Sequence, residues 1–272
     1  MIIAGFITSS LKFIGMKVKR LLQVQNISKL YGIPDTENAV EALNDVDFSI
    51  ENGEFVAIMG PSGSGKTTLL NVISGIDKPT DGVVLINDEA IHEMSKEQQA
   101  IFRRQKIGFI FQDFNLLDSL DVKDNILLPM ILEKKSPEQL EQKLTQLSEL
   151  FGLQSILHKF PHEISGGQKQ RVAISRALIN EPAIIFADEP TGNLDSKNAA
   201  ILMENLKKIV DQLETTILLV THDVFAASYC QKVLFIKDGS LHSSILNGGN
   251  QQEFLQQIMS SLTDEGGINH DI

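Results

Sequence analysis

The sequence predicts an α/β fold with a mainly parallel sheet, an N-terminal antiparallel β subdomain and an inserted α-helical subdomain. Residues 22–27 and 46–50 alternate apolar and polar side chains, which is the pattern of half-buried strands. Phe55–Met59 is instead a continuous apolar run that ends in a glycine-rich turn, as expected of a buried parallel strand. Residues 121–180 have helical patterning throughout, so we expect a block of helices inserted between strands of the sheet.

The parallel sheet is expected to be built from strand and helix units. After Lys66, apolar residues at helical spacing predict a helix that stops at Gly75. Because a strand, a turn and a helix follow one another directly, this unit is the expected start of the parallel sheet. Further buried strands are predicted at four apolar runs, which are Ile107–Phe111, Ala183–Ala187, Thr216–Val220 and Val233–Ile236.

Capping signals place the inserted helices. Ser136, Pro137 and Gln139 form an N-terminal capping signature, and Gly152 is a stop signal. We therefore expect a main domain over residues 21–246 that contains a helical subdomain at about 119–180. Residues 247–272 are expected to form a tail with a short amphipathic helix that packs on a neighbour. Its apolar face is predicted to hold Phe254, Leu255, Ile258, Met259 and Leu262.

The composition excludes several classes of protein. Of the 272 residues, 42% are apolar and 22% are charged, so the chain is neither disordered nor collagen-like. Its 24 basic and 35 acidic residues give a net charge of −11, which disfavours nucleic acid as a partner. The single cysteine, Cys230, can form no internal disulfide, fits a reducing cytosol and is expected to be a small buried residue.

Residues 1–20 are expected to be an N-terminal extension. Its apolar part, Met1–Gly15, is shorter than the roughly 20 residues that a spanning helix needs. No basic residue precedes this apolar run, as one would in a secretory signal. Met16 leads straight into the first predicted strand, so both Met1 and Met16 stay open as the start of the chain. No run of 18 apolar residues occurs elsewhere, so any membrane role is expected to come through a partner.

Residues 60–67 match the pattern G-x-x-x-x-G-K-[ST] between a predicted strand and a predicted helix. In this pattern, backbone N–H groups surround a polyphosphate and the helix N-terminus supplies positive potential. Lys66 is expected to reach the terminal phosphates and the Thr67 hydroxyl to ligate Mg²⁺. A purely structural glycine turn is the alternative, and the position between strand and helix argues against it. The expected nucleotide-binding residues here are Gly60, Pro61, Ser62, Gly63, Ser64, Gly65, Lys66, Thr67 and Thr68.

Two carboxylates, Asp188 and Glu189, directly follow the predicted strand at 183–187. Ligands of open α/β sheets bind at the carboxyl ends of the strands, so both side chains are expected beside the phosphate loop. We expect Asp188 to hold Mg²⁺ and Glu189 to polarise the attacking water as a general base. Solvated turn carboxylates are the alternative, and the presence of Lys66 argues against it.

A second glycine-rich turn, Ser165-Gly166-Gly167-Gln168, precedes an apolar helix and predicts a second phosphate-binding surface. A simple loop turn explains so short a pattern equally well when it stands alone. With the phosphate loop before it and the Asp188 strand after it, the order resembles the ATP-binding cassette (ABC) ATPases, from about Arg20 to Val233. The resemblance implies a P-loop NTPase core, ATP and Mg²⁺ as cofactors, and hydrolysis of ATP to ADP and phosphate.

The resemblance also implies roles for residues outside the phosphate loop. Gln112 matches the glutamine that contacts Mg²⁺, which gives Thr67, Gln112 and Asp188 as the implied metal site. Tyr31 matches the aromatic residue that stacks on adenine. A structural role is the alternative for Tyr31, because the long segment 32–41 follows it.

Two further matches concern catalysis and assembly. His222 matches the histidine that contacts the γ-phosphate, so the implied catalytic residues are Lys66, Glu189 and His222. Asp195 matches the loop that crosses to the other subunit. In the implied head-to-tail homodimer, the Ser165 turn of one subunit closes over the phosphates bound by the other.

Residues 190–195 resemble the subgroup of lipoprotein-release, macrolide-efflux and cell-division ATPases, and segments 108–118, 125–129, 226–230 and 248–254 resemble the bacitracin-resistance (Bce) type. The Bce resemblance implies an integral-membrane permease as partner, a sensor histidine kinase acting through it, and a place at the cytoplasmic face of the membrane. The other subgroup members stay open as alternatives. A nucleic-acid-linked or ribosome-acting member is disfavoured, because the chain is acidic and has neither a heptad insertion nor a second cassette.

Four apolar residues beside Gln112 have two interpretations. They are either a socket for the permease or part of the helical subdomain core, and the sequence leaves both open. The four are Phe114, Leu116, Leu117 and Leu120.

Overall fold

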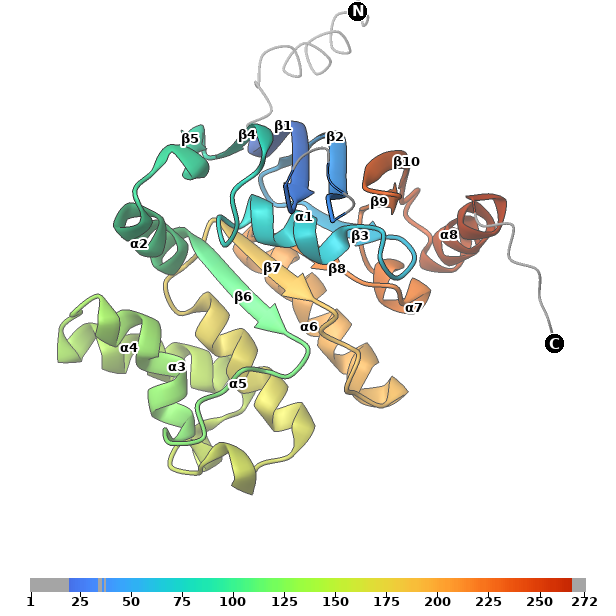
Figure 1. The fold of residues 1–272 in the computed structure, drawn as a ribbon. Coiled ribbons are helices and arrows are strands. Elements are labelled where there is room, and N and C mark those ends of the chain that lie inside the picture. Colours follow the sequence, from blue (N-terminus) through green and yellow to red (C-terminus); the bar gives the residue numbers. More distant parts are fainter. Residues whose placement is uncertain (1–19, 34–35, 37, 266–272) are drawn as a thin grey trace, which may run out of the picture.

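The computed structural model describes residues 20–33, 36 and 38–265. The expected N-terminal extension, except Arg20, and both candidate start positions, Met1 and Met16, lie outside the described residues. Two sheets form the centre of the molecule (Figure 1). The predicted mixed α/β architecture, with antiparallel strands at the N-terminus and a mainly parallel sheet after them, is confirmed.

The first sheet is antiparallel and has the order β2-β1-β4-β5. Along β1, buried and exposed positions alternate in part, so apolar side chains such as Leu22 and Val24 face the interior. The strand bounds are β1 Arg20–Tyr31, β2 Val40–Glu51, β4 Asp81–Ile86 and β5 Glu89–Ala90.

The second sheet has the order β10-β9-β3-β8-β7-β6 and is parallel except for β10. Every residue of β3 and β8 is buried, because structure covers both faces of these central strands. β6 lies at one edge of the sheet. The bounds are β3 Phe55–Met59, β6 Ile107–Phe111, β7 Ile184–Asp188, β8 Thr216–Val220, β9 Lys232–Lys237 and β10 Ser240–Leu246.

The helices fall into two groups. α3, α4 and α5 gather on one side of the molecule, away from the antiparallel sheet (Figure 1). Of the others, α1, α2, α6 and α8 contact strands of the second sheet and α7 contacts α6 and α8. Short 3₁₀ turns occupy Ile91–Glu93, Gln154–Ile156 and Pro161–Glu163. The helix bounds are α1 Lys66–Ile73, α2 Lys96–Lys106, α3 Val122–Leu132, α4 Pro137–Phe151, α5 Gly166–Leu178, α6 Ser196–Leu213, α7 Val224–Ala227 and α8 Gln251–Glu265.

The capping signals predicted for α4 are confirmed. The Ser136 side chain accepts from the Gln139 backbone N–H, and the Gln139 side chain accepts from the Ser136 N–H. These two bonds satisfy donors that a helix N-terminus leaves without partners. Gly152 ends the helix in a left-handed conformation, with φ 62°.

Successive residues of β3 point into different halves of the core. Phe55, Ala57 and Met59 join the apolar cluster that extends to α3, α4 and α5. Val56 and Ile58 join a second cluster that includes the antiparallel sheet and α1. The parallel sheet thus separates two apolar cores.

The structure also contains elements that the sequence analysis did not predict, namely β4, β5, α2 and β10. The sequence of α2 has no apolar stripe that would predict a helix, and only Gln99 and Phe102 of this helix are buried. β10 has no buried residue and pairs only with β9.

The tail helix differs from its prediction in one residue. Phe254 and Ile258 are buried, as expected of positions i and i+4 on one face. Met259 is 54% exposed, because the next residue along a helix is rotated by about 100° from the buried face. α8 packs against α7 and β10. Among the helices that the structure describes, none is long and apolar enough to span a membrane.

Candidate active site

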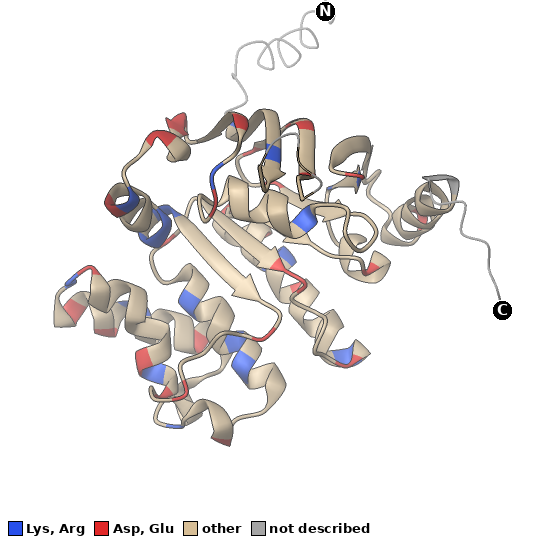
Figure 2. Cartoon of the chain, in the orientation of Figure 1, with Lys and Arg blue, Asp and Glu red and all other residues tan. Residues whose placement is uncertain are grey.

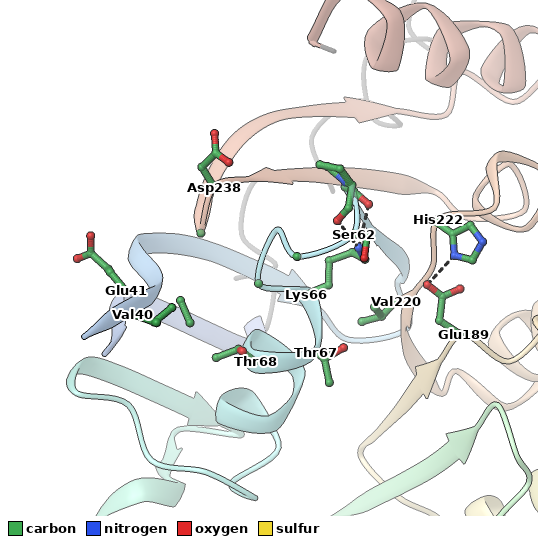
Figure 3. A pocket seen from close by; sticks show the side chains of 16 residues that line it. Val40, Glu41, Ser62, Lys66, Thr67, Thr68, Glu189, Val220, His222 and Asp238 are labelled. Atoms are coloured by element: carbon green, nitrogen blue, oxygen red, sulfur yellow. Dashed lines mark hydrogen bonds and ion pairs between the residues drawn. The ribbon is translucent and has the colours of Figure 1, made fainter. Parts of the chain in front are cut away.

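A cavity of about 830 Å³ opens at the carboxyl edge of the parallel sheet (Figure 3). The loop between β3 and α1 forms its floor, and the ends of β7 and β8 contribute one wall. The turn between β9 and β10 and the start of β2 contribute the opposite side. Its lining residues are Val40, Glu41, Ala42, Gly60, Pro61, Ser62, Gly63, Gly65, Lys66, Thr67, Thr68, Glu189, Val220, His222, Asp238 and Gly239.

The loop requires glycine at two positions for different reasons. A Cβ on Gly60 would lie 2.1 Å from the Ile236 carbonyl oxygen, so the neighbouring strand leaves no room for a side chain. Gly65 has φ +97°, and a Cβ there would lie 2.5 Å from the Ala42 carbonyl oxygen. These glycines therefore let the loop fold tightly against β9 and β2 while it stays open toward the cavity.

The N-terminus of α1 fits a polyphosphate. No side chain caps this helix, so its first N–H groups keep the donor capacity that side chains satisfy at other helix starts. Lys66 is the first residue of α1, and its Nζ donates back to the loop carbonyl oxygens of Gly60 at 2.9 Å and Pro61 at 2.8 Å. Burial lowers the Lys66 pKa, while the charges of Glu189 and Asp188 act in the opposite direction. The free N–H groups of α1, the positive end of its helix dipole and the Lys66 ammonium group therefore all lie beside the cavity.

Glu189 and His222 form a pair across the cavity from Glu41 and Asp238 (Figure 3). Glu189 Oε1 lies 2.9 Å from His222 Nδ1, and the Thr221 hydroxyl donates to Glu189 Oε2 at 3.4 Å. The Glu189 side chain is 20% exposed, whereas that of His222 is 73% exposed. The carboxylate is thus held in place at the cavity wall, and the imidazole remains open to a ligand.

Of the three implied metal ligands, only Thr67 lines the cavity. Asp188 and Gln112 are not among the lining residues. Burial and the neighbouring Glu189 raise the Asp188 pKa, as expected where a compensating cation belongs. Gln112 Nε2 donates to Asn193 Oδ1 at 3.4 Å.

The donor set suits Mg²⁺ that is bound together with a nucleotide. The described residues include no group of three or more His, Cys, Asp or Glu side chains that could hold a metal alone. Mg²⁺ in nucleotide sites usually takes one or two protein oxygen ligands and completes its shell with phosphate and water. A hydroxyl and a carboxylate beside a phosphate cradle fit this pattern.

The second glycine-rich turn does not reach the cavity of its own chain. Ser165 is the N-cap of α5, where its side chain and that of Gln168 form a capping box. None of the residues Ser165, Gly166, Gly167 and Gln168 lines the cavity. The turn lies instead beside the start of α6, since a Cβ on Gly167 would be 3.2 Å from Asn198 Oδ1.

Asp195 has a structural role within its own chain. Its side chain caps α6 and accepts from the backbone N–H of Asn198 at 2.8 Å and from the Asn198 side chain at 2.8 Å. These bonds lower the Asp195 pKa. The predicted residue therefore lies next to the Ser165 turn and apart from the cavity.

Tyr31 lies next to the cavity without lining it. Its hydroxyl donates to Asp77 Oδ2 at 2.9 Å, and Lys29 Nζ lies 4.8 Å from the ring centroid. Val40, the cross-strand partner of Tyr31, does line the cavity. Tyr31 is 40% exposed at this rim, which leaves part of its surface available to a ligand.

The sequence analysis missed the residues that form the side of the cavity opposite Glu189. The turn at Gly239 is tied to the start of β2 and to the phosphate loop, because Asn44 N–H donates to Gly239 O at 2.9 Å and Gly239 N–H donates to Ser64 O at 3.1 Å. These residues carry no motif, and only the pairing of distant strands brings them together. They are Val40, Glu41, Ala42, Asp238 and Gly239.

The comparisons with known proteins agree with this geometry. A family model described as "ABC transporter" matches residues 43–192. The chain is 49% identical to the "ABC transporter ATP-binding protein YxdL" of Bacillus subtilis, over 93% of this chain and 97% of the relative. It is 47% identical to the "Bacitracin export ATP-binding protein BceA" of Halalkalibacterium halodurans, over 92% and 99%. A solved dimer of the Methanocaldococcus jannaschii cassette MJ0796, bound to ADP and Pi, is 39% identical with a TM-score of 0.75, over 84% of this chain and 100% of that chain.

Proposed function

The chain belongs to the ABC transporter family, and we propose that it is the Mg²⁺-dependent ATPase subunit of a Bce-type antimicrobial-peptide transporter. The observation that carries the proposal is the single cavity in which Lys66, Thr67, Glu189 and His222 meet at the N-terminus of α1. This arrangement combines a phosphate cradle, a cation and a positioned carboxylate, which hydrolysis of ATP requires. The relative named for bacitracin export supports the finer assignment.

The residues act on ATP in distinct ways. Lys66 exchanges its two carbonyl acceptors for phosphate oxygens, because a charge-assisted hydrogen bond is stronger than a neutral one. Glu189, held by His222 and Thr221, accepts a proton from the attacking water. Thr67, Gln112 and Asp188 would hold Mg²⁺, which supplies charge neutralisation at the phosphates when bound.

The position of the Ser165 turn argues that a second copy completes the site. The turn and the phosphate loop each occur once in the chain, and the turn does not line the cavity beside the loop. A head-to-tail pair places the Ser165 turn of one subunit over the phosphates bound by Lys66 of the other. The dimeric cassette with bound ADP and Pi supports this arrangement.

The segment after Gln112 provides a connection to a permease. Asn125 is fully buried and binds the segment at the backbone N–H of Leu117 and at the carbonyl oxygens of Leu117 and Leu120. The Leu117 side chain is nevertheless 46% exposed, whereas Leu116 packs against the apolar core. Leu117 is thus available for docking and Leu116 belongs to the core. Docking at this surface would place the subunit at the cytoplasmic face of the membrane.

The Bce-type assignment is tested by bacitracin susceptibility in the native host. A strain without this chain should become more susceptible to bacitracin, wild-type chain should restore resistance, and a Lys66→Ala chain should not. A Bce-type system also predicts that the strain loses bacitracin-induced transcription, because the sensor kinase acts through the permease. Unchanged bacitracin susceptibility together with altered macrolide susceptibility, lipoprotein release or cell division would assign the chain to one of those subgroups.

A further inference from the structure

Tyr31 belongs to a cluster of polar contacts at the rim of the nucleotide cavity. Its hydroxyl donates to Asp77 Oδ2 at 2.9 Å, and Asp77 Oδ1 lies 2.9 Å from Lys29 Nζ. The same Lys29 Nζ lies over the Tyr31 ring, 4.8 Å from its centroid. One carboxylate thus holds both the tip of the ring and the cation that covers one of its faces.

The cluster is partly withdrawn from solvent and fully bonded. The Lys29 side chain is 11% exposed and that of Asp77 is 33% exposed. Lys29 Nζ also donates to the Lys78 carbonyl oxygen at 2.7 Å, and the Lys78 N–H donates to Asp77 Oδ1 at 2.7 Å. Burial acts to raise the pKa of the Asp77 carboxyl, but the hydrogen bonds from Lys29, Tyr31 and the Lys78 backbone outweigh it and lower the pKa. The carboxylate is therefore ionised, and its hydrogen bonds are charge-assisted.

Asp77 attaches the cluster to the helix that forms the phosphate cradle. Its backbone N–H donates to the carbonyl oxygen of Asn71, near the end of α1, at 3.0 Å. Figure 2 shows acidic and basic segments next to each other in the connection between α1 and β4, and a basic segment on β1. The aromatic ring is thus tied through one residue to the helix that carries Lys66 and Thr67.

The ring lies at the end of the cavity away from Glu189. Val40, the cross-strand partner of Tyr31, and Thr68 both line the cavity. Burial raises the pKa of the Tyr31 hydroxyl and the Thr68 side chain acts in the opposite direction, so the hydroxyl lies close to Thr68. In Figure 3, Lys66 lies between Glu189 on one side and the pair Val40 and Thr68 on the other. A nucleotide with its phosphates at Lys66 and its γ-phosphate toward Glu189 therefore extends its base toward Tyr31.

We propose that Lys29 and Asp77 are positioning residues for the base of the bound nucleotide, because they hold the Tyr31 ring with one face against the Lys29 ammonium group and the opposite face toward the base. The inference rests on the proposed function for the nucleotide and adds the residues that prepare its base site. Ordering one flexible side chain on binding costs roughly 2- to 12-fold in affinity. The cluster removes this cost before the nucleotide arrives.

A structural staple between β1 and the α1–β4 connection is the alternative role for the same contacts. A staple stabilises the fold, so its loss affects every part of the nucleotide site alike. A positioning pair acts through the Tyr31 ring alone, so its loss affects only ligands that carry a base. The two roles therefore differ in which ligands sense the loss of Lys29.

Binding of ADP and of pyrophosphate to the full chain, each with Mg²⁺, distinguishes the two roles. Both ligands have two phosphates, only ADP has a base, and neither has the γ-phosphate that would join two chains. Displacement of a fluorescent ADP analogue measures both affinities. Lys29→Met should lower the affinity for ADP by roughly 2- to 12-fold and leave that for pyrophosphate unchanged. Lys78→Met makes the same charge change at an exposed residue beside the cluster, so both affinities should change by less than about 2-fold.

A double variant shows whether Lys29 acts through the ring. Tyr31→Ala should lower the affinity for ADP by roughly 5- to 150-fold, the range expected when a base loses an aromatic side chain on which it stacks. With no ring to position, Lys29→Met should have no further effect in a Tyr31→Ala chain. Wild-type ADP affinity of Lys29→Met, an equal loss for pyrophosphate, or a full additional loss in the double variant would each overturn the proposal.

Tyr31→Phe keeps the test valid if Lys29→Met does not fold. It removes only the hydroxyl that Asp77 holds, at an exposed residue. The affinity for ADP should fall by roughly 2- to 12-fold while that for pyrophosphate stays at the wild-type value. An unchanged ADP affinity in this variant would refute the inference and leave the proposed function intact. Failure of the wild-type chain to bind either ligand would refute the proposed function itself.

Discussion

Replacement of Glu189 by glutamine removes the proposed general base while it keeps the shape of the side chain. The amide can retain a hydrogen bond to His222, whose Nδ1 lies 2.9 Å from Oε1, and the backbone at this position, with φ 46°, is unaltered. Fold and nucleotide binding should therefore persist. General acid–base catalysis contributes about 10²–10⁴ in rate, so ATP turnover should fall by that factor, which corresponds to about 2.7–5.4 kcal/mol of activation free energy.

The matched control for this prediction is Glu41→Gln. Glu41 lines the same cavity but lies on its opposite side, across Lys66 from Glu189 (Figure 3). Release of phosphate from Mg-ATP measures turnover, and binding of a fluorescent ATP analogue shows that both proteins are loaded. Glu41→Gln should hydrolyse ATP at nearly the wild-type rate. Wild-type turnover by Glu189→Gln, or an equal loss in both variants, would remove Glu189 from the role of base.

Three further perturbations test the loop, the tail and the metal site. Gly65→Ala should weaken ATP binding roughly 10-fold or more, because its Cβ would lie 2.5 Å from a backbone carbonyl oxygen, whereas Gly248→Ala has open space and should bind normally; a binding titration decides. Phe254→Ala should lower the free energy of unfolding by about 3–5 kcal/mol in denaturant melts, and Met259→Ala, at an exposed position, by under about 0.5 kcal/mol. The pKa of Asp188 is raised from its ordinary value of 3.8, so at higher pH the ionised carboxylate destabilises the folded state relative to the unfolded chain. Nucleotide-free Asp188→Asn should therefore melt at a higher temperature than wild type at pH 7, and this difference should vanish as the pH falls below 3.8, where the carboxyl is protonated in both states.

The phosphate loop and its flanking elements could be predicted because local sequence determines them. A buried strand, a glycine turn and an apolar helix follow one another within residues 55–73, and the structure places β3 and α1 there. The strand before Glu189 was predicted within one residue for the same reason, since a continuous apolar run has few other solutions in an α/β fold. The chemical types of Lys66, Glu189 and His222 then pointed to one site.

Elements without an apolar pattern could not be predicted. α2 depends on tertiary packing of Phe102 and Gln99, and β10 has no buried residue at all. The cavity wall at Val40 and Gly239 likewise depends on hydrogen bonds between β2 and the turn after β9, which lie far apart in the sequence. Periodicity reports the burial of a segment and carries no information about which distant segment covers it.

The separation of the Ser165 turn from the phosphate loop of its own chain was implied by the family resemblance and not by any local pattern of residues. Ser165 and Asp195 were predicted to act at the interface with a second copy, and within one chain the structure places both as helix caps away from the cavity. The order of the motifs shows that the chain has a phosphate loop and a Ser165 turn. The structure shows that the Ser165 turn does not line the cavity beside the phosphate loop of the same chain. The arrangement between two copies is therefore the central claim of the account.

Crosslinking between two differently tagged chains tests this claim most directly. Ser62→Cys places a thiol in the phosphate loop of one chain and Ser165→Cys places one in the second turn of the other, both in a Glu189→Gln background; both positions are exposed, and the native Cys230 is fully buried. With Mg-ATP and a short bifunctional thiol reagent, the account predicts a covalent dimer that joins the two tags, and none without nucleotide. No covalent dimer at saturating ATP, or an equal yield of covalent dimer without nucleotide, would contradict a site completed by the second copy.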